Sequence, residues 1–173
     1  MKYLVISDIH GKIEYAKRID DIVKREQPNK FILLGDLYDD YSGRSNIEVS
    51  YILNKYKDII MCTRGNCDNS FDESISDFVF KDYIELTINN KNFFFTHGHR
   101  YGIDNIPDYI DVYVFGHLHT GLIKTIENKI VVNTGSLSVP RKNTEHSYLM
   151  IDDKNIILKD INGNIIDKKV YNN

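Results

Sequence analysis

The chain has 173 residues, of which 42% are hydrophobic and 27% are charged, and its formal net charge is −3. This length and composition are typical of one globular domain, so we expect a single domain over residues 1–173 and exclude a disordered chain. No run of Lys or Arg is longer than two, which excludes the basic footprint of a protein with an obligate nucleic-acid partner.

The N-terminus and the cysteines predict the compartment. The apolar run Tyr3–Ile6 is followed closely by Asp8, and it is too short for a signal peptide or a membrane span. Cys62 and Cys67 lie five positions apart, and they form neither a CxxC pair nor a disulfide framework. We therefore expect a cytoplasmic protein that does not use a membrane.

The first 70 residues predict short strands that alternate with helices. Tyr3–Ser7 is an apolar run typical of a buried strand, and apolar residues recur at helical spacing over 13–23. Lys30–Leu34 and Asp58–Cys62 predict two further strands, with a second helical stripe over 49–56 between them. Strands that alternate with helices usually pair in parallel, so we expect a parallel sheet here.

From about residue 83 the pattern changes to strands joined by short turns. The predicted strands are Ile84–Ile88, Asn92–Thr96, Val112–Phe115, Leu122–Ile126 and Ile130–Asn133, with three more between Ser147 and Val170. Asn89-Asn90 and Asn162-Gly163 tolerate the positive φ of two-residue hairpin turns, which favours antiparallel pairing. The expected fold class is therefore α/β (α+β), with two packed mixed β-sheets flanked by helices.

Five short polar motifs follow predicted strands, at the edge where open α/β sheets place their ligand sites. They are Asp8-Ile9-His10, Gly35-Asp36, Gly65-Asn66-Cys67-Asp68, His97-Gly98-His99 and Gly116-His117-Leu118-His119, and they hold five of the six histidines. A lone Asp after a strand is often a helix cap, and a lone His is often a core residue. Carboxylates, imidazoles and an amide gathered at strand ends instead favour a shared metal site.

The ligand types narrow the choice of metal. Two Asp oxygens, one Asn carbonyl and four imidazoles form a set without thiolate, which suits Mn²⁺, Fe²⁺, Co²⁺, Ni²⁺ or Zn²⁺ better than Ca²⁺. Seven ligands are too many for one tetrahedral ion, but they suffice for two ions if one carboxylate bridges, an arrangement that recurs in phosphatases and nucleases. We therefore expect two divalent cations and favour Mn²⁺.

The five motifs, in this order, resemble those of the calcineurin-like metallophosphoesterase superfamily. Within it the chain is most similar to the small YfcE-type phosphodiesterases, through Ser7–Gly11, Arg64–Asp68, Thr96–His99 and Asn133–Pro140. The resemblance implies a four-layer αββα sandwich. It also implies a phosphoric diester hydrolase whose small phosphate-ester substrate is attacked by a hydroxide that bridges the two metals.

The resemblance also assigns the metal ligands. It implies that the first metal is held by Asp8, His10, Asp36 and His119. It implies that the second metal is held by Asp36, Asn66, His97 and His117, so that Asp36 bridges the two. Every ligand position of the family pattern is filled, which weighs against a decayed, non-catalytic copy.

Each of three neighbouring residues fits more than one role. Cys67 stands where the superfamily commonly has a catalytic His, and its thiol either assists as a weak donor or packs as a small half-buried group. His99 could contact the phosphate, orient His97 or line the cleft, and we expect a secondary catalytic role. Asp68 is expected to fix a ligand imidazole or the Asn66 amide, with a turn aspartate as the alternative.

Three other functions stay open on sequence grounds. A retromer subunit resembles this family yet serves as a protein-binding scaffold, which makes a scaffold on the same fold the main rival. A nuclease of the superfamily would be expected to carry a basic groove or added domains. A phosphomonoesterase or pyrophosphatase would use the same metal ligands. Small domains of this kind often pair, so a homodimer or larger homo-oligomer is also compatible with the sequence.

Overall fold

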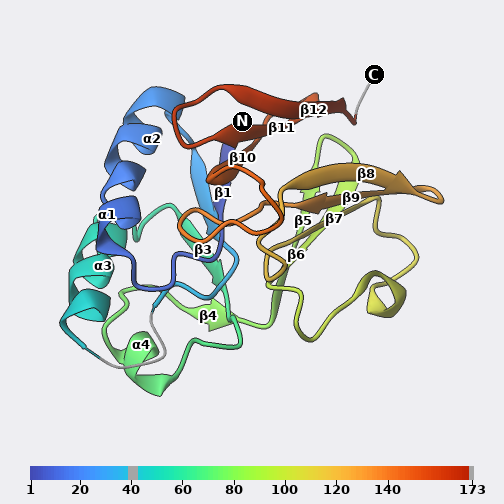
Figure 1. The fold of residues 1–173 in the computed structure, drawn as a ribbon. Helices are drawn as coiled ribbons and strands as arrows, with labels where there is room; N and C mark the ends of the chain where they lie inside the picture. Colours follow the sequence, from blue (N-terminus) through green and yellow to red (C-terminus); the bar gives the residue numbers. More distant parts are fainter. Residues whose placement is uncertain (39–42, 172–173) are drawn as a thin grey trace.

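Two β-sheets pack against each other in the computed structural model, which describes residues 1–38 and 43–171 (Figure 1). The two mixed sheets predicted from the sequence are confirmed. In the described parts of the chain, no helix is both long and apolar enough to cross a membrane.

The larger sheet combines strands from both ends of the chain. Its N-terminal strands are β1 (Tyr3–Ile6), β2 (Lys30–Leu33), β3 (Ile60–Thr63) and β4 (Phe80–Lys81), and its C-terminal strands are β10 (Ser147–Ile151), β11 (Asn155–Asp160) and β12 (Ile165–Val170). Their order is β12-β11-β10-β1-β2-β3-β4. The strands β1 to β3 pair in parallel, as predicted for the first 70 residues. The strand β4, which was not predicted, pairs with β3 in parallel, whereas β10 joins β1 antiparallel.

The smaller sheet has the order β5-β6-β7-β9-β8. Its strands are β5 (Tyr83–Ile88), β6 (Lys91–Thr96), β7 (Val112–Phe115), β8 (Leu122–Ile126) and β9 (Lys129–Asn133). The β5–β6 and β8–β9 hairpins are antiparallel as predicted, but β6, β7 and β9 pair in parallel, so the prediction of hairpins throughout was wrong. The segment 97–111 is long enough to cross over and return in the same direction, and turn residues in the sequence report only on local geometry.

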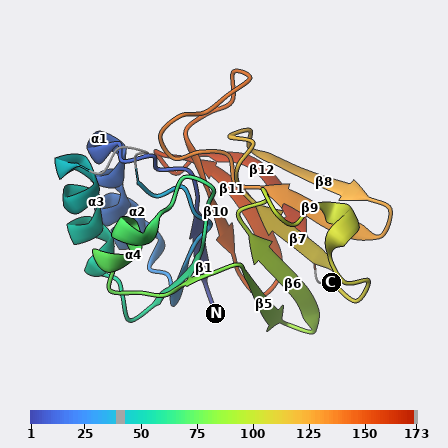
Figure 2. The same cartoon turned by 90° about the horizontal axis from the view of Figure 1, so that it is seen from below.

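The α-helices lie on the outer side of the larger sheet (Figure 2). They are α1 (Ile13–Ala16), α2 (Arg18–Glu26), α3 (Arg44–Asn54) and α4 (Ser70–Ser74). The stripe predicted over 13–23 is therefore divided between α1 and α2. The outer face of the smaller sheet is covered by the loop after β6, which contains only the 3-10 helix η1 (Ile103–Asn105) and packs Ile106 and Ile110 against Phe94.

Strand alternation builds a separate core on each face of the larger sheet. In β1, Leu4 and Ile6 pack with the helices, whereas Val5 packs with Phe93 and Phe95 of the smaller sheet. Each such buried side chain stabilises the fold by roughly 1.5–3 kcal/mol. The core between the sheets fixes β1, β2, β6 and β7 relative to one another, and with them the loops at their carboxyl ends.

Candidate metal centre

Loops at the carboxyl ends of five strands bring the seven predicted ligands together. These residues follow β1 (Asp8, His10), β2 (Asp36), β3 (Asn66), β6 (His97) and β7 (His117, His119). The first three of these strands belong to the larger sheet and the last two to the smaller one. Both sheets therefore contribute to a single site.

Five of the seven residues adopt left-handed backbone conformations that non-glycine residues rarely use. Their φ angles are 57° at Asp8, 48° at His10, 50° at Asp36, 64° at His117 and 56° at His119. Such residues cost of order 1–3 kcal/mol each and persist where neighbouring structure holds them. Here the loops hold one another, since the amides of Ile9 and His10 donate to the carbonyl oxygen of Asp36 at 2.9 and 3.0 Å.

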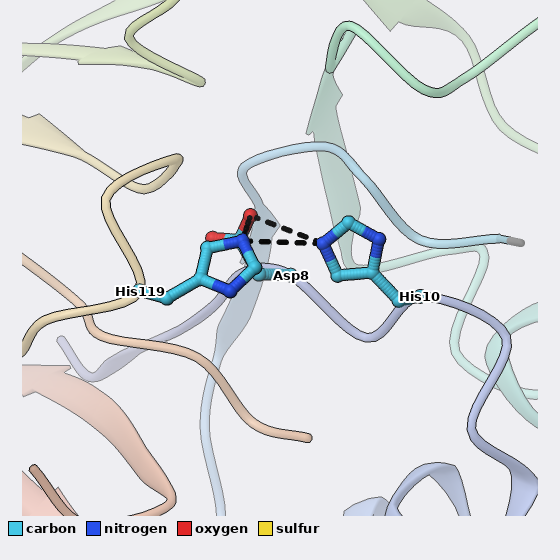
Figure 3. A group of neighbouring side chains, drawn as sticks. All are labelled: Asp8, His10 and His119. Atoms are coloured by element: carbon cyan, nitrogen blue, oxygen red, sulfur yellow. Dashed lines mark hydrogen bonds and ion pairs between the residues drawn. The ribbon is translucent and has the colours of Figure 1, made fainter. Parts of the chain in front are cut away.

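Asp8, His10 and His119 form the first group of candidate ligands (Figure 3). Nε2 of His119 lies 3.0 Å from Oδ1 of Asp8 and 3.2 Å from Nε2 of His10. Nδ1 of His119 faces the carbonyl oxygen of Val139 at 2.8 Å. Since only a protonated nitrogen donates to a carbonyl, a neutral His119 presents a lone pair at Nε2.

The carboxylate of Asp8 uses one oxygen, Oδ2, for a backbone hydrogen bond, which leaves Oδ1 for the site. Oδ2 of Asp8 accepts the backbone N–H of His117 at 3.0 Å. Oδ1 of Asp8 is buried and accepts no hydrogen bond from the described residues. Nε2 of His119 lies close to it, but the two groups form an ion pair only when that imidazole is protonated. Lone-pair atoms that converge on an orphaned carboxylate oxygen fit a divalent cation.

Asp36, His97 and His117 form a second group, with the Asn66 amide beside them. Nε2 of His97 lies 3.2 Å from Oδ2 of Asp36 and 3.1 Å from Oδ1 of Asn66. It also lies 3.2 Å from Nδ1 of His117. Nδ1 of His97 faces the carbonyl oxygen of Leu34 at 2.7 Å, so Nε2 is the nitrogen directed into the site.

Asp36 lies between the two groups. Its Oδ2 is 3.2 Å from Nε2 of His97 in the second group and 3.8 Å from Nε2 of His10 in the first. Its Oδ1 accepts the backbone N–H of Cys67 at 2.8 Å, which fixes the orientation of the carboxylate. A carboxylate that bridges two cations needs this intermediate position.

Buried negative charge at the centre is balanced by imidazoles alone. Asp8 is fully buried and Asp36 is 2% exposed, and among the described residues only histidines form ion pairs with them. Burial opposes ionisation of Asp8, but contacts with His10 and His119 outweigh it and hold its pKa well below the usual range. Burial likewise opposes ionisation of Asp36, but the contact with His97 outweighs it and lowers the pKa of Asp36. The same contact raises the pKa of His97, although burial opposes that shift. Divalent cations would supply the positive charge that an imidazole provides only when it is protonated.

Asp68 holds the loops after β2 and β3 through backbone N–H groups, which are not the partners that the sequence predicted. Its buried carboxylate accepts the backbone N–H groups of Asp36 and Leu37 at 2.9 Å and of Gly65 at 2.8 Å. Among the described residues these three donors, and not an imidazole or the Asn66 amide, are its hydrogen-bond partners. Burial raises its pKa to about 6 although these donors oppose the shift. Asp68 thereby joins the ligand loops after β2 and β3, which approach so closely that a Cβ on Gly35 would lie 2.3 Å from the Gly65 nitrogen.

Cys67 and His99 lie beside the ligands. Sγ of Cys67 is within 4.8 Å of ligand atoms of His10 and Asp36, although the sequence-based ligand set contained no thiolate. The ring centroid of His99 lies 5.3 Å from that of His97, and its buried Nδ1 has no hydrogen-bond partner in the described chain. Burial lowers the pKa of His99, as does the charge of His97. A catalytic role for either residue stays a prediction.

Sequence reasoning missed the loop after β9 as a functional element. The hydroxyl groups of Ser136 and Ser138 both contact the carbonyl oxygen of Asp8. The signal was the stretch Asn133–Pro140, which resembles the family but contains no residue that could be assigned as a metal ligand.

Comparisons with known proteins show which proteins the chain is similar to. The chain is 28% identical over 161 residues to the phosphodiesterase YfcE of Escherichia coli K12, with 88% of each chain covered. It is 29% identical over 161 residues to the probable metallophosphoesterase YsnB of Bacillus subtilis, with 87% of this chain and 83% of that protein covered. The solved structure of Yfce, a phosphoesterase from E. coli, matches with a TM-score of 0.91 at 26% identity, over 99% of this chain and 100% of that one.

More distant structures share the fold alone. Wild-type Vps29 of Entamoeba histolytica, solved in complex with Zn²⁺, matches with a TM-score of 0.67 at 18% identity, over 99% of this chain and 100% of that one. The family itself is shown by sequence, because residues 1–155 match the calcineurin-like phosphoesterase superfamily domain. The chain therefore belongs to the calcineurin-like phosphoesterase superfamily.

Proposed function

We propose that the chain is a phosphodiesterase that uses two divalent cations, preferably Mn²⁺, to hydrolyse a small phosphate diester. The observation that carries this proposal is the position of Asp36 between two groups of inward-facing ligand atoms. The likeness to YfcE, a named phosphodiesterase, supports the diester as substrate. The mixed oxygen and nitrogen ligands suit Mn²⁺, Fe²⁺, Co²⁺, Ni²⁺ and Zn²⁺, and Mn²⁺ is our proposal among these ions.

The charge of the loaded centre suits an anionic substrate. Two divalent cations with Asp8 and Asp36 would leave about two positive charges at a site that both sheets enclose. When bound, such cations lower the pKa of a water molecule so that hydroxide is available at neutral pH, and they neutralise charge on the phosphate oxygens. A single cation in the first group would leave Asn66, His97 and His117 without a role.

The chain itself supplies positioning. Asp36 would hold the cations at a fixed separation, and the backbone acceptors of His97 and His119 turn their Nε2 atoms inward. The carboxylate of Asp68 ties the loops after β2 and β3 together. In phosphoryl transfer, catalysis comes mainly from such positioning and from charge stabilisation.

The site offers no strong proton donor for the leaving group at the Cys67 position. The thiol of Cys67 lies beside Asp36, where the superfamily commonly has a His, and a neutral thiol donates a hydrogen bond poorly. We therefore propose that the substrate has a leaving group that departs without strong protonation, as activated aryl esters do.

Metal exchange and a substrate panel test the proposal. The protein is stripped with a chelator, reloaded with Mn²⁺, Ni²⁺ or Mg²⁺, and assayed on bis(p-nitrophenyl) phosphate, p-nitrophenyl phosphate and natural diesters. We expect turnover only after reloading, highest with Mn²⁺, and faster for the diester than for the monoester. Turnover that survives stripping would contradict metal dependence, and a preference for monoesters would indicate a phosphomonoesterase.

A protein-binding scaffold is the rival from another functional class, since Vps29 shares this fold. The complete ligand set and the orphaned Oδ1 of Asp8 weigh against a scaffold, because a scaffold has no need for buried unpaired carboxylate oxygens. Because Vps29 was itself solved with Zn²⁺, turnover measured together with elemental analysis of the purified protein decides between the two. Absence of both bound metal and turnover would favour the scaffold.

A further inference from the structure

The loop after β9 contacts the backbone of the first ligand group at Asp8 and Ile9. Oγ of Ser136 donates to the carbonyl oxygen of Asp8 at 2.7 Å. Oγ of Ser138 lies 3.0 Å from the same oxygen and 2.7 Å from the carbonyl oxygen of Ile9. Both serines are buried, at 0% and 5% exposed, so water does not compete for these bonds.

The backbone that these hydroxyl groups hold is strained. Asp8 has a φ of 57°, a conformation that an L-residue with a Cβ adopts only when its surroundings hold it. The amide of Asp8 is also held, since it donates to the carbonyl oxygen of Gly35 at 3.1 Å. With both sides of the residue fixed, its carboxylate is directed at the first ligand group.

The same loop orients the imidazole of His119. Oγ of Ser136 accepts the backbone N–H of Val139 at 2.8 Å, and the carbonyl oxygen of Val139 accepts Nδ1–H of His119 at 2.8 Å. The hydroxyl group of Ser136 also accepts the backbone N–H of Ser138 at 3.2 Å. One donor and two acceptor positions are the full capacity of a hydroxyl group.

The second ligand group has different supports. His97 is oriented by the carbonyl oxygen of Leu34, and the backbone of Asp36 is held by Asp68. Neither support comes from the loop after β9. The link that remains between Asp8 and the second group is the bond from the backbone N–H of His117 to Oδ2 of Asp8. A defect in that loop should therefore act much more strongly on the first cation than on the second.

We propose that Ser136, assisted by Ser138, is a positioning residue for the first cation. Its hydroxyl group fixes the backbone of Asp8 and, through Val139, the direction of Nε2 of His119. This inference rests on the proposed function, because it requires a cation at Asp8, His10 and His119. Partners that orient metal ligands typically change metal affinity by about 10- to 100-fold when they are removed.

Calorimetric titration of the chelator-treated full chain with Mn²⁺ tests the inference. His119→Ala and His97→Ala identify which binding step belongs to which group. We expect Ser136→Ala to weaken the His119-dependent step by about tenfold or more and to change the His97-dependent step by less than about twofold. The control is Ser50→Ala, which removes an equally buried hydroxyl group that donates to the carbonyl oxygen of Ile47 within α3 at 2.9 Å.

The outcomes separate this inference from the proposed function. Two Mn²⁺ steps in the parent protein that Ser136→Ala leaves unchanged, or weakens equally, would overturn the inference and leave the proposed function standing. A parent protein that binds no Mn²⁺ would overturn both. If thermal unfolding shows that Ser136→Ala does not fold, Ser138→Ala takes its place, with a smaller loss expected in the His119-dependent step alone and equal or absent weakening again contradicting the inference.

Discussion

Two buried acidic clusters in this protein are balanced in different ways. At the end of α2, Glu26 is 8% exposed, and its carboxylate accepts Nζ of Lys159 at 2.8 and 2.9 Å and the hydroxyl group of Tyr148 at 2.6 Å. At the metal centre, Asp8 and Asp36 are buried at least as deeply, but among the described residues only histidines pair with them.

The difference separates a structural cluster from a ligand site. A lysine carries a permanent charge at neutral pH, so the cluster around Glu26 is complete with protein groups alone. Imidazoles lose their protons near neutral pH, and their nitrogen atoms then become metal ligands. The partner of a buried carboxylate, rather than its burial, indicates which of the two roles it has.

The largest expected effect comes from removing the bridging carboxylate. Asp36→Asn should abolish binding of both Mn²⁺ ions and reduce turnover by about 1000-fold, because even one preorganised electrostatic partner contributes about 100- to 1000-fold. Metal content and turnover of bis(p-nitrophenyl) phosphate measure the two effects. The control is Asp21→Asn, which makes the same charge change at a side chain 70% exposed. Full activity in Asp36→Asn would rule out the two-metal scheme.

Neutralising the other cluster should change stability and spare activity. Glu26→Gln should lower the free energy of unfolding by about 2–3 kcal/mol, because it removes charged hydrogen bonds from a buried carboxylate. Urea denaturation measures this loss, and turnover with saturating Mn²⁺ should stay at the parent level. Glu48→Gln, which breaks a surface pair with Arg44, should cost less than about 1 kcal/mol. A matching loss of activity in Glu26→Gln would mean that the two clusters are coupled.

The stability difference between the parent protein and Glu26→Gln should depend on pH, in a direction that the pKa of Glu26 fixes. Burial opposes ionisation of Glu26, but Lys159 and Tyr148 outweigh it and lower its pKa from the ordinary value of 4.5. The folded protein then binds fewer protons than the unfolded chain, so this stabilisation is complete above pH 4.5 and disappears as the pH falls below it. The stability difference between the parent protein and Glu26→Gln should therefore shrink from pH 6 to pH 3. A difference independent of pH would contradict the shift.

The sequence allowed candidate ligand residues to be named but not their supports. Hydrophobic periodicity shows where strands end, and Asp8, Asp36 and His97 follow such ends within three positions. The contact between Glu26 and Lys159 joins residues 133 positions apart, and no local pattern encodes it. The backbone oxygen atom that each imidazole faces, such as that of Val139, depends in the same way on how distant loops pack.

Connectivity in the smaller sheet shows the same limit. The turn at Asn89-Asn90 was predicted correctly, because positive φ at both residues is a local property. The parallel pairing of β6 with β7 was not, because it depends on the course of the loop 97–111, which has no periodic signal. This pairing places His97 and His117 on neighbouring strand ends, where their nitrogen atoms come within 3.2 Å.

The smallest expected effect concerns the thiol beside the bridge. Cys67→Ala should retain turnover of bis(p-nitrophenyl) phosphate within about tenfold of the parent protein, since a neutral thiol is a weak donor and an activated leaving group needs little protonation. The rate ratio between activated and unactivated diesters should also stay nearly constant. Cys62→Ala is the matched control, because it removes a buried thiol that donates to the neighbouring Thr63 carbonyl oxygen, outside the ligand groups. Complete loss of turnover in Cys67→Ala alone would make the thiol an essential part of the centre, and its closeness to His10 and Asp36 would then argue for a direct role beside the cations.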